Sequence, residues 1–145
     1  MNDPLPQGAS IGILGGGQLG RMLSVAASRL GFRTHIYEPA ANPPAAHVAD
    51  RVTTAPYEDL DSLRAFAATV DVVTYEFENV PTEALDAIEA LRPIRPNRRA
   101  LAISQDRILE KDFLTGLGLT CAPYAAVTTA ADLDAALAKI GPPAI

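Results

Sequence analysis

The chain has little of several features that would assign it to a specialised class of protein. It contains one cysteine, Cys121, among its 145 residues, which excludes an internal disulfide and favours a reducing compartment. No apolar run approaches the roughly 18 residues of a membrane span. The first ten residues carry no cationic apolar segment of the signal-peptide type. These absences favour a soluble protein of the cytoplasm with no membrane partner.

An excess of basic charge is also missing. The formal net charge is −5, which argues against bulk electrostatic binding to nucleic acid, because such binding needs a basic face. No Cys/His cluster has the spacing of metal ligands, so we expect no metal site within these residues. A hydrophobic content of 48% with 20% charged residues is typical of a folded globular protein.

The sequence does have a glycine cluster between a short apolar run and a helical pattern. Gly15, Gly17 and Gly20 have the G-x-G-x-x-G spacing, which lets a backbone turn tightly and approach an anionic ligand at a helix N-terminus. The bare pattern indicates a nucleotide or a phosphate. Glu38 lies about where dinucleotide-binding folds keep an acid for a ribose hydroxyl, so spacing alone leaves an NAD-binding module open.

Strand-like and helix-like stretches alternate with short connections, which predicts an α/β fold with a doubly wound, mainly parallel sheet. The expected strands are 10–14, 34–37, 51–54, 70–75 and a short 94–96, and the expected helices are 18–30, 59–69, 81–91, 98–117 and 132–140. The fourth helical pattern is expected to break near Ser104. Gly141 to Ile145 has the pattern of a helix stop followed by the beginning of a strand, so we interpret the chain as a fragment with a domain boundary near residue 100.

The doubly wound order places the first strand beside the fourth, and ligands bind at the carboxyl ends of strands at such a switch point. The glycine loop and the segment 74–79 should therefore meet, with Gln18 and Glu76 on one rim of the sheet. Alternation along an extended chain points Glu76 and Glu78 to the same side. Glu76 could accept hydrogen bonds from an amine or a sugar hydroxyl of a ligand. The alternative is that both glutamates cap the helix beginning near Pro81 or are simply solvated.

A third candidate is the charged segment that begins at Gln105. Arg107 and Lys111 are four residues apart, hence on one helical face, and either could meet a phosphate. The alternative is an ordinary solvated helix surface.

Three motifs together resemble the N-terminal part of the N5-carboxyaminoimidazole ribonucleotide synthetases, which are ATP-grasp ligases of purine biosynthesis. The motifs are Gly15-Gly16-Gly17-Gln18-Leu19-Gly20-Arg21-Met22, Thr74-Tyr75-Glu76-Phe77-Glu78-Asn79-Val80-Pro81, and Gln105-Asp106-Arg107 leading to Glu110-Lys111. The resemblance runs from about Ser10 to the last residue. It implies a pre-ATP-grasp, Rossmann-like substrate domain in residues 1–100 and the truncated start of an ATP-grasp domain in residues 101–145.

The resemblance also implies a reaction, in which ATP and Mg²⁺ are used to carboxylate aminoimidazole ribonucleotide with bicarbonate. Carried over by motif, Gly17, Gln18, Leu19 and Glu76 contact the ribonucleotide, and Arg107 contacts ATP. The ATP-binding lysine, the glycine-rich lid and the acidic Mg²⁺ ligands of such ligases are expected downstream. This fragment therefore holds no catalytic residue and is expected to be inactive alone. A homodimer is implied for the full-length enzyme.

Three alternatives remain open from the sequence. A related ATP-grasp enzyme, the formate-dependent glycinamide ribonucleotide transformylase, shares the domain plan and a similar glycine loop. An NAD-binding module of an oxidoreductase fits the glycine spacing and Glu38. A stand-alone ligand-binding or regulatory domain would use the same fold without catalysis.

Overall fold

The computed structural model of the chain describes residues 4–142. The chain divides into two compact units, one within Met1–Leu101 and one within Ala102–Ile145. The elements of the first unit, in chain order, are β1 (Ser10–Leu14), α1 (Gln18–Arg29), β2 (Arg33–Tyr37), the 3-10 helix η1 (Pro44–His47), β3 (Arg51–Thr53), α2 (Leu60–Ala68), β4 (Val72–Tyr75) and α3 (Thr82–Glu89). Helix α4 (Arg98–Ser104) follows, and α5 (Arg107–Gly116) and α6 (Ala130–Ile140) belong to the second unit.

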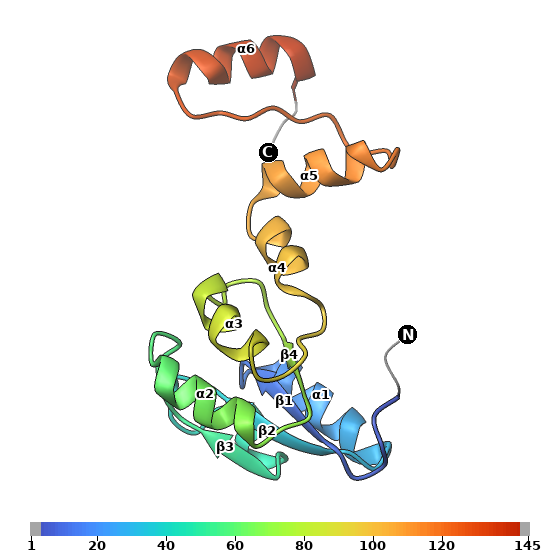
Figure 1. Ribbon diagram of the computed structural model, residues 1–145. Coiled ribbons are helices and arrows are strands. Elements are labelled where there is room, and N and C mark those ends of the chain that lie inside the picture. The colour runs from blue at the N-terminus through green and yellow to red at the C-terminus, as the bar shows by residue number, and fades with distance from the viewer. Residues whose placement is uncertain (1–3, 143–145) are drawn as a thin grey trace. The chain divides into compact units, whose positions relative to one another are not determined.

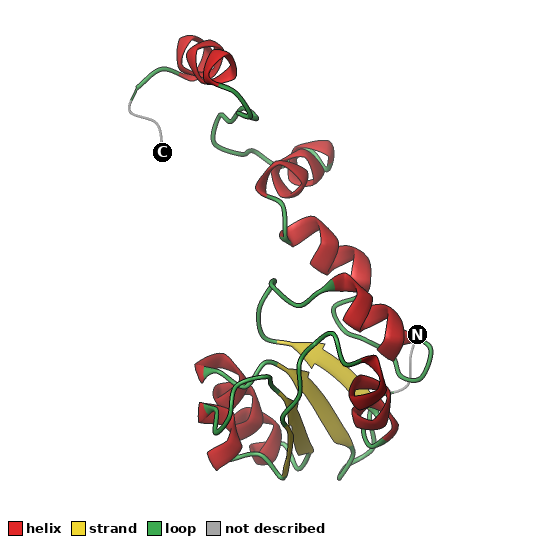
Figure 2. Ribbon diagram, turned by 90° about the vertical axis from the view of Figure 1, so that its left-hand side faces the viewer, coloured by secondary structure: helices red, strands yellow, loops and turns green. Residues whose placement is uncertain are grey.

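The four strands form a parallel sheet in the order β3-β2-β1-β4 (Figure 1). β1 is therefore central and lies beside both β2 and β4, which confirms the predicted doubly wound arrangement. Helices cover both faces of the sheet (Figure 2). All carboxyl ends of the strands meet at one rim, where the loops after β1, β2 and β4 come together.

The core is built from the alternation of side chains along the strands. Leu14 and Tyr37 pack on one face of the sheet with residues of α2 and α3, including Phe66 and Leu85. The next residue back along β1, Ile13, packs on the other face in a small cluster with Ile36 and Ala45. A strand buried on both faces needs a continuous apolar run, and Ile11 to Leu14 provides one around Gly12.

One expectation needs correction. The stretch 94–96 is not a strand, since Ile94 makes a single parallel bridge to Val73. Pro93 has no N–H to donate toward β4, so the pairing cannot extend back along the chain from this bridge. The predicted break in the pattern over 98–117 is confirmed, since α4 ends at Ser104. The side chain of Asp106 accepts hydrogen bonds from the amides of Ile108 and Leu109 and starts α5 as a new helix.

The second unit contains the end of α4, the helices α5 and α6 and the segments between them. Thr129 and Asp132 form a reciprocal capping box at the start of α6, and hydrogen bonds to Thr128 and Thr129 lower the pKa of Asp132 to about 2. The expected strand beyond Gly141 falls largely on residues 143–145, which lie outside the described part of the chain. No helix within residues 4–142 is long and apolar enough to cross a membrane.

Candidate functional site

The glycine loop joins β1 to α1 at the rim where the strands end. Gly15 has a φ of +104°, a conformation that side chains rarely adopt, and a Cβ built there would lie 2.4 Å from Cγ of Glu76. The amide of Gly15 donates to the carbonyl of Tyr37, and the amide of Glu76 donates to the carbonyl of Leu14. The loop is thus fastened between the ends of β2 and β4, and it is glycine-rich because Glu76 packs directly against it.

The carboxylate of Glu76 caps α1. One of its oxygens accepts from the amide of Gly17 at 2.8 Å, and the other accepts from the amide of Gly20. The N-cap residue of α1 is Gly17, which has no side chain to do this. A negative charge is also favourable at the positive end of a helix. The predicted meeting of the loop with the end of β4 is confirmed.

The alternative reading of Glu76 is wrong. Helix α3 has Pro81 as its N-cap residue and no side-chain cap, so Glu76 does not cap it. The geometry also revises our expectation for the loop. The amides of Gly17 and Gly20 already have an acceptor in the protein, and a ligand could take them only by displacing Glu76.

Two backbone donors of the same turn have no acceptor within residues 4–142. They are the amides of Gln18 and Leu19, the first two residues of α1, and both residues are exposed. Helix N-termini with open amides bind anions readily. These two residues, which the motif comparison had selected, are therefore the accessible part of the glycine loop.

The carboxylate of Glu38 binds the amide of Gly16, the loop residue before Gly17. Its two oxygens accept from the amide of Gly16 at 2.7 Å and from the amide of Ala40 at 2.9 Å. In a dinucleotide fold the corresponding acid faces a ribose. Here the carboxylate is engaged by backbone amides on both sides, so its main role is to join the ends of β1 and β2.

A pocket of about 340 Å³ lies beside the loop. Its walls come from the glycine loop, the segment after β2 and the segment after β4, and the lining residues are Gly17, Glu38, Ala40, Ala41, Asn42, Pro43, Pro44, Glu76 and Phe77. Two carboxylates in its wall favour groups that donate hydrogen bonds, such as hydroxyls and amines, over anions. None of residues 40–44 in this wall was predicted from the sequence. The available signal was that the segment follows a strand ending at the same rim.

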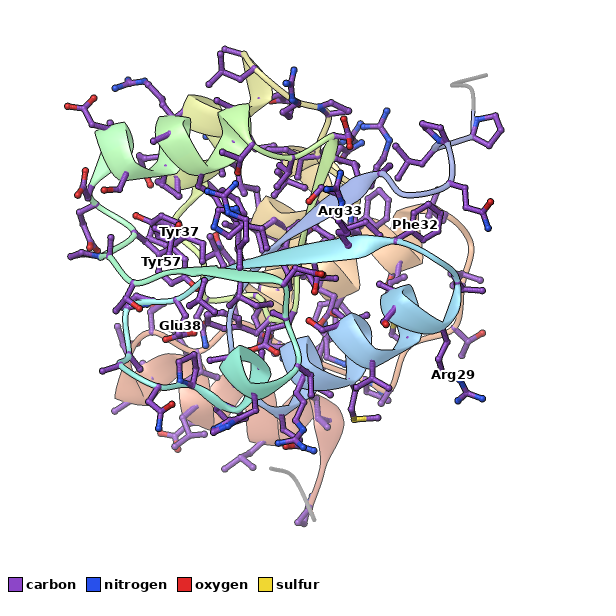
Figure 3. All side chains as sticks on the ribbon, turned by 90° about the horizontal axis from the view of Figure 1, so that it is seen from below. Arg29, Phe32, Arg33, Tyr37, Glu38 and Tyr57 are labelled. Atoms are coloured by element: carbon purple, nitrogen blue, oxygen red, sulfur yellow. The ribbon has the colours of Figure 1, made fainter. Side chains whose placement is uncertain are left out.

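Tyr57, in the loop between β3 and α2, is a second feature that the sequence analysis missed. Its ring packs between those of Tyr37, with centroids 5.8 Å apart, and Phe77, with centroids 6.4 Å apart. Figure 3 shows Tyr57 in the same part of the unit as Tyr37 and Glu38, away from Arg33 at the opposite end of β2. Burial raises the pKa of Tyr57 well above its usual value, and the charges of Glu38 and Glu76 raise it further.

Arg107 is the first residue of α5, in the second unit. Its guanidinium lies 2.6 Å from a carboxylate oxygen of Glu110, and its side chain is 74% exposed. The ammonium of Lys111 lies 5.4 Å from the centre of the Tyr124 ring. An exposed ion pair of this kind is worth little and is easily exchanged, so the geometry leaves the Arg107 side chain accessible to a ligand.

The described residues also define what the site does not contain. Within residues 4–142, no three His, Cys, Asp or Glu side chains gather in a way that could hold a metal ion.

Comparison with known proteins gives a consistent result. Residues 9–105 match the family model of the ribonucleotide synthetase preATP-grasp domain. An N5-carboxyaminoimidazole ribonucleotide synthase of Brucella melitensis is 50% identical over 137 residues, which are 94% of this chain and 38% of the relative.

Solved structures agree with this match. An ADP complex of an N5-carboxyaminoimidazole ribonucleotide synthetase superposes with a TM-score of 0.91 at 37% identity, over 99% of this chain and 38% of the other. The Aspergillus clavatus N5-carboxyaminoimidazole synthase, in complex with ADP and 5-aminoimidazole ribonucleotide, gives a TM-score of 0.82 at 33% identity, over 94% of this chain and 37% of the other.

The chain thus spans less than two-fifths of the length of these relatives. The family model nevertheless covers more than half of the chain, over the β-sheet unit that carries the glycine loop and Glu76. The chain belongs to the ribonucleotide synthetase preATP-grasp domain family.

Proposed function

We propose that the chain is the substrate-binding part of an ATP-dependent ligase that carboxylates 5-aminoimidazole ribonucleotide with bicarbonate, giving N5-carboxyaminoimidazole ribonucleotide for purine biosynthesis. The observation that carries this proposal is the rim of the sheet, where the open amides of Gln18 and Leu19 lie next to the carboxylate of Glu76. A relative of known structure, the Aspergillus clavatus enzyme, binds this ribonucleotide and ADP.

The open amides and the carboxylate at this rim suit different groups of a ribonucleotide. A ribonucleotide carries a phosphate, which backbone amides at a helix N-terminus bind well. It also carries ribose hydroxyls, and in this case an amine, which donate to carboxylates such as Glu76. We assign the ribonucleotide contacts to Gly17, Gln18, Leu19 and Glu76. Their role is to hold and orient the amine that becomes carboxylated, which lowers the entropic part of the barrier.

We assign Arg107 to ATP. Its exposed guanidinium can exchange the carboxylate of Glu110 for a phosphate, because Arg forms strong two-pronged hydrogen bonds to phosphate oxygens. ATP supplies the phosphoryl group that activates bicarbonate, and Mg²⁺ on the nucleotide phosphates neutralises charge as in other phosphoryl transfers. The metal ligands and catalytic residues belong, in this proposal, to the part of the relatives that extends beyond the matched region. A homodimer in the cytoplasm is part of the same proposal.

The test is the ligase reaction of the polypeptide encoded by the native gene. We expect ADP release that depends on both aminoimidazole ribonucleotide and bicarbonate. Activity with glycinamide ribonucleotide and formate in their place would instead identify the related transformylase. Residues 1–145 alone are expected to form no ADP, and measurable ADP release from them would contradict the assignment of the catalytic residues.

Two variants assign the binding residues. Arg107→Ala should raise the KM for ATP by about tenfold or more, while the KM for the ribonucleotide stays near the wild-type value. Glu76→Gln should do the reverse, and Glu78→Gln, two residues along the same segment, is the matched control. A titration with NADH followed by fluorescence covers the dinucleotide alternative. Micromolar binding that Glu38→Ala abolishes would overturn the proposal.

A further inference from the structure

The hydroxyl of Tyr57 is a buried polar group without a hydrogen bond. The residue is 9% exposed, and its oxygen has no partner among the residues that the structure describes. Such groups are rare because burying a hydroxyl without a partner costs free energy. The neighbouring Tyr37 shows that the fold can satisfy a tyrosine in this stack, since its hydroxyl donates to the carbonyl of Pro56 at 2.7 Å.

The ring of Tyr57 lies behind the wall of the candidate site. The ring of Tyr57 packs against Phe77, which lines the pocket and directly follows Glu76 in the chain. The charges of Glu38 and Glu76 both raise the pKa of Tyr57, so both carboxylates act electrostatically on it. A hydroxyl is a hydrogen-bond donor and a carboxylate is an acceptor, so a carboxylate that moves at this rim is a suitable partner for the Tyr57 hydroxyl.

Glu76 is the carboxylate that a ligand would release. Both of its oxygens are held by amides of the glycine loop, at the same helix end where Gln18 and Leu19 offer open donors. An anion bound there competes for those amides and repels the carboxylate. Glu38, in contrast, accepts from Gly16 and from Ala40 in its own turn, and neither amide belongs to α1. A displaced Glu76 needs a new donor.

We propose that Tyr57 is a positioning residue for Glu76, whose carboxylate accepts a hydrogen bond from the Tyr57 hydroxyl when a ribonucleotide occupies the glycine loop. The inference rests on the proposed function. The hydroxyl is unsatisfied in the ligand-free protein and becomes satisfied in the complex. Tyr57 thereby holds Glu76 in the orientation in which it accepts from the hydroxyls or the amine of the ligand.

The substitution Tyr57→Phe tests this, because it removes only the hydroxyl. In the polypeptide encoded by the native gene, we expect the KM for aminoimidazole ribonucleotide to rise about tenfold. The KM for ATP and kcat should stay within twofold of the wild type. The melting temperature of the ligand-free protein should be unchanged or higher, because the variant loses an unsatisfied buried group. A structural role alone would lower the melting temperature.

Two matched variants complete the experiment. Tyr37→Phe removes a hydroxyl that has an acceptor, so it should lower the melting temperature and leave the KM for the ribonucleotide unchanged. Ser24→Ala removes the other buried hydroxyl without a partner, in α1, and should not lower the melting temperature or change that KM.

The outcomes separate the two proposals. A wild-type protein that does not turn over aminoimidazole ribonucleotide refutes the proposed function. A wild-type protein that does so, with a Tyr57→Phe variant whose KM for this substrate stays within twofold, refutes the role of Tyr57. A rise in KM that comes with a lower ligand-free melting temperature also refutes it, because the hydroxyl would then act in the fold.

Discussion

The capping of α1 by Glu76 can be tested by truncating this side chain to alanine. Glu76→Ala removes both hydrogen bonds to the glycine loop. Gly20 is buried, so its amide is left without an acceptor, at a cost of roughly 1–3 kcal/mol. Gly17 is half-buried, and water can replace part of its bond, so the loss there is closer to that of an ordinary cap, about 0.5–1 kcal/mol. The free energy of unfolding should fall by about 1.5–4 kcal/mol in total.

Urea denaturation followed by tyrosine fluorescence measures this loss, because three of the four tyrosines lie in the first unit, at positions 37, 57 and 75. Glu76→Gln retains one acceptor oxygen and should lose about half as much. The exposed Glu78→Ala is the control and should stay within about 0.5 kcal/mol of the wild type. If Glu76→Ala is no less stable than Glu78→Ala, the carboxylate does not hold the loop.

Three further changes are predicted from the same contacts. Gly20→Ala should destabilise the protein despite the better helix propensity of alanine, because its Cβ would lie 2.6 Å from the carbonyl oxygen of Gly15; thermal denaturation showing a gain would contradict the packing. Gly17→Val should raise the KM for the ribonucleotide, because a Cβ there meets a carboxylate oxygen of Glu76 at 2.8 Å, and an unchanged KM would refute the loop assignment. Burial, and to a smaller extent the charge of Arg51, lowers the pKa of His35 to about 4 in the folded protein. As the pH falls, His35 is therefore protonated in the unfolded chain before it is protonated in the folded protein. The free energy of unfolding should therefore be at its highest above pH 6.5 and fall by about 3 kcal/mol as the pH drops toward 4. His35→Gln should remove this pH dependence of the free energy of unfolding, whereas His47→Gln should retain it.

Much of the fold could be predicted from the sequence, because local pattern determines it. β1 has the predicted bounds, and α1 ends one residue before the prediction, at Arg29, with Leu30 as its C-cap residue. The position of β1 beside β4 follows from the general order of doubly wound sheets, and that order places Glu76 near the glycine loop. The predicted strand at 94–96 failed where a single residue decides the pairing, since Pro93 before Ile94 has no N–H to donate to β4.

The meeting of the glycine loop with Glu76 could be predicted from the sequence, but the hydrogen bonds between them could not. A carboxylate at a strand end can point to a ligand, a helix or solvent, and the sequence gives no preference among them. The contact of Glu76 with the amides of Gly17 and Gly20 depends on the register between β1 and β4, which only the structure provides. Tyr57 lies in a turn with no pattern of its own, so its place behind the pocket wall is a purely tertiary property. The ATP contact of Arg107 stays a prediction.

The central claim is that the glycine loop of this chain binds a ribonucleotide and not a dinucleotide. Amide resonances of the ¹⁵N-labelled protein, recorded during titration with aminoimidazole ribonucleotide and separately with NADH, test it most directly. The account predicts that the ribonucleotide shifts the amides of Gln18 and Leu19, together with those of Gly17 and Gly20 as Glu76 leaves them, and that NADH shifts none of these. Loop amides that respond to NADH, or that do not move at saturating ribonucleotide, would contradict it.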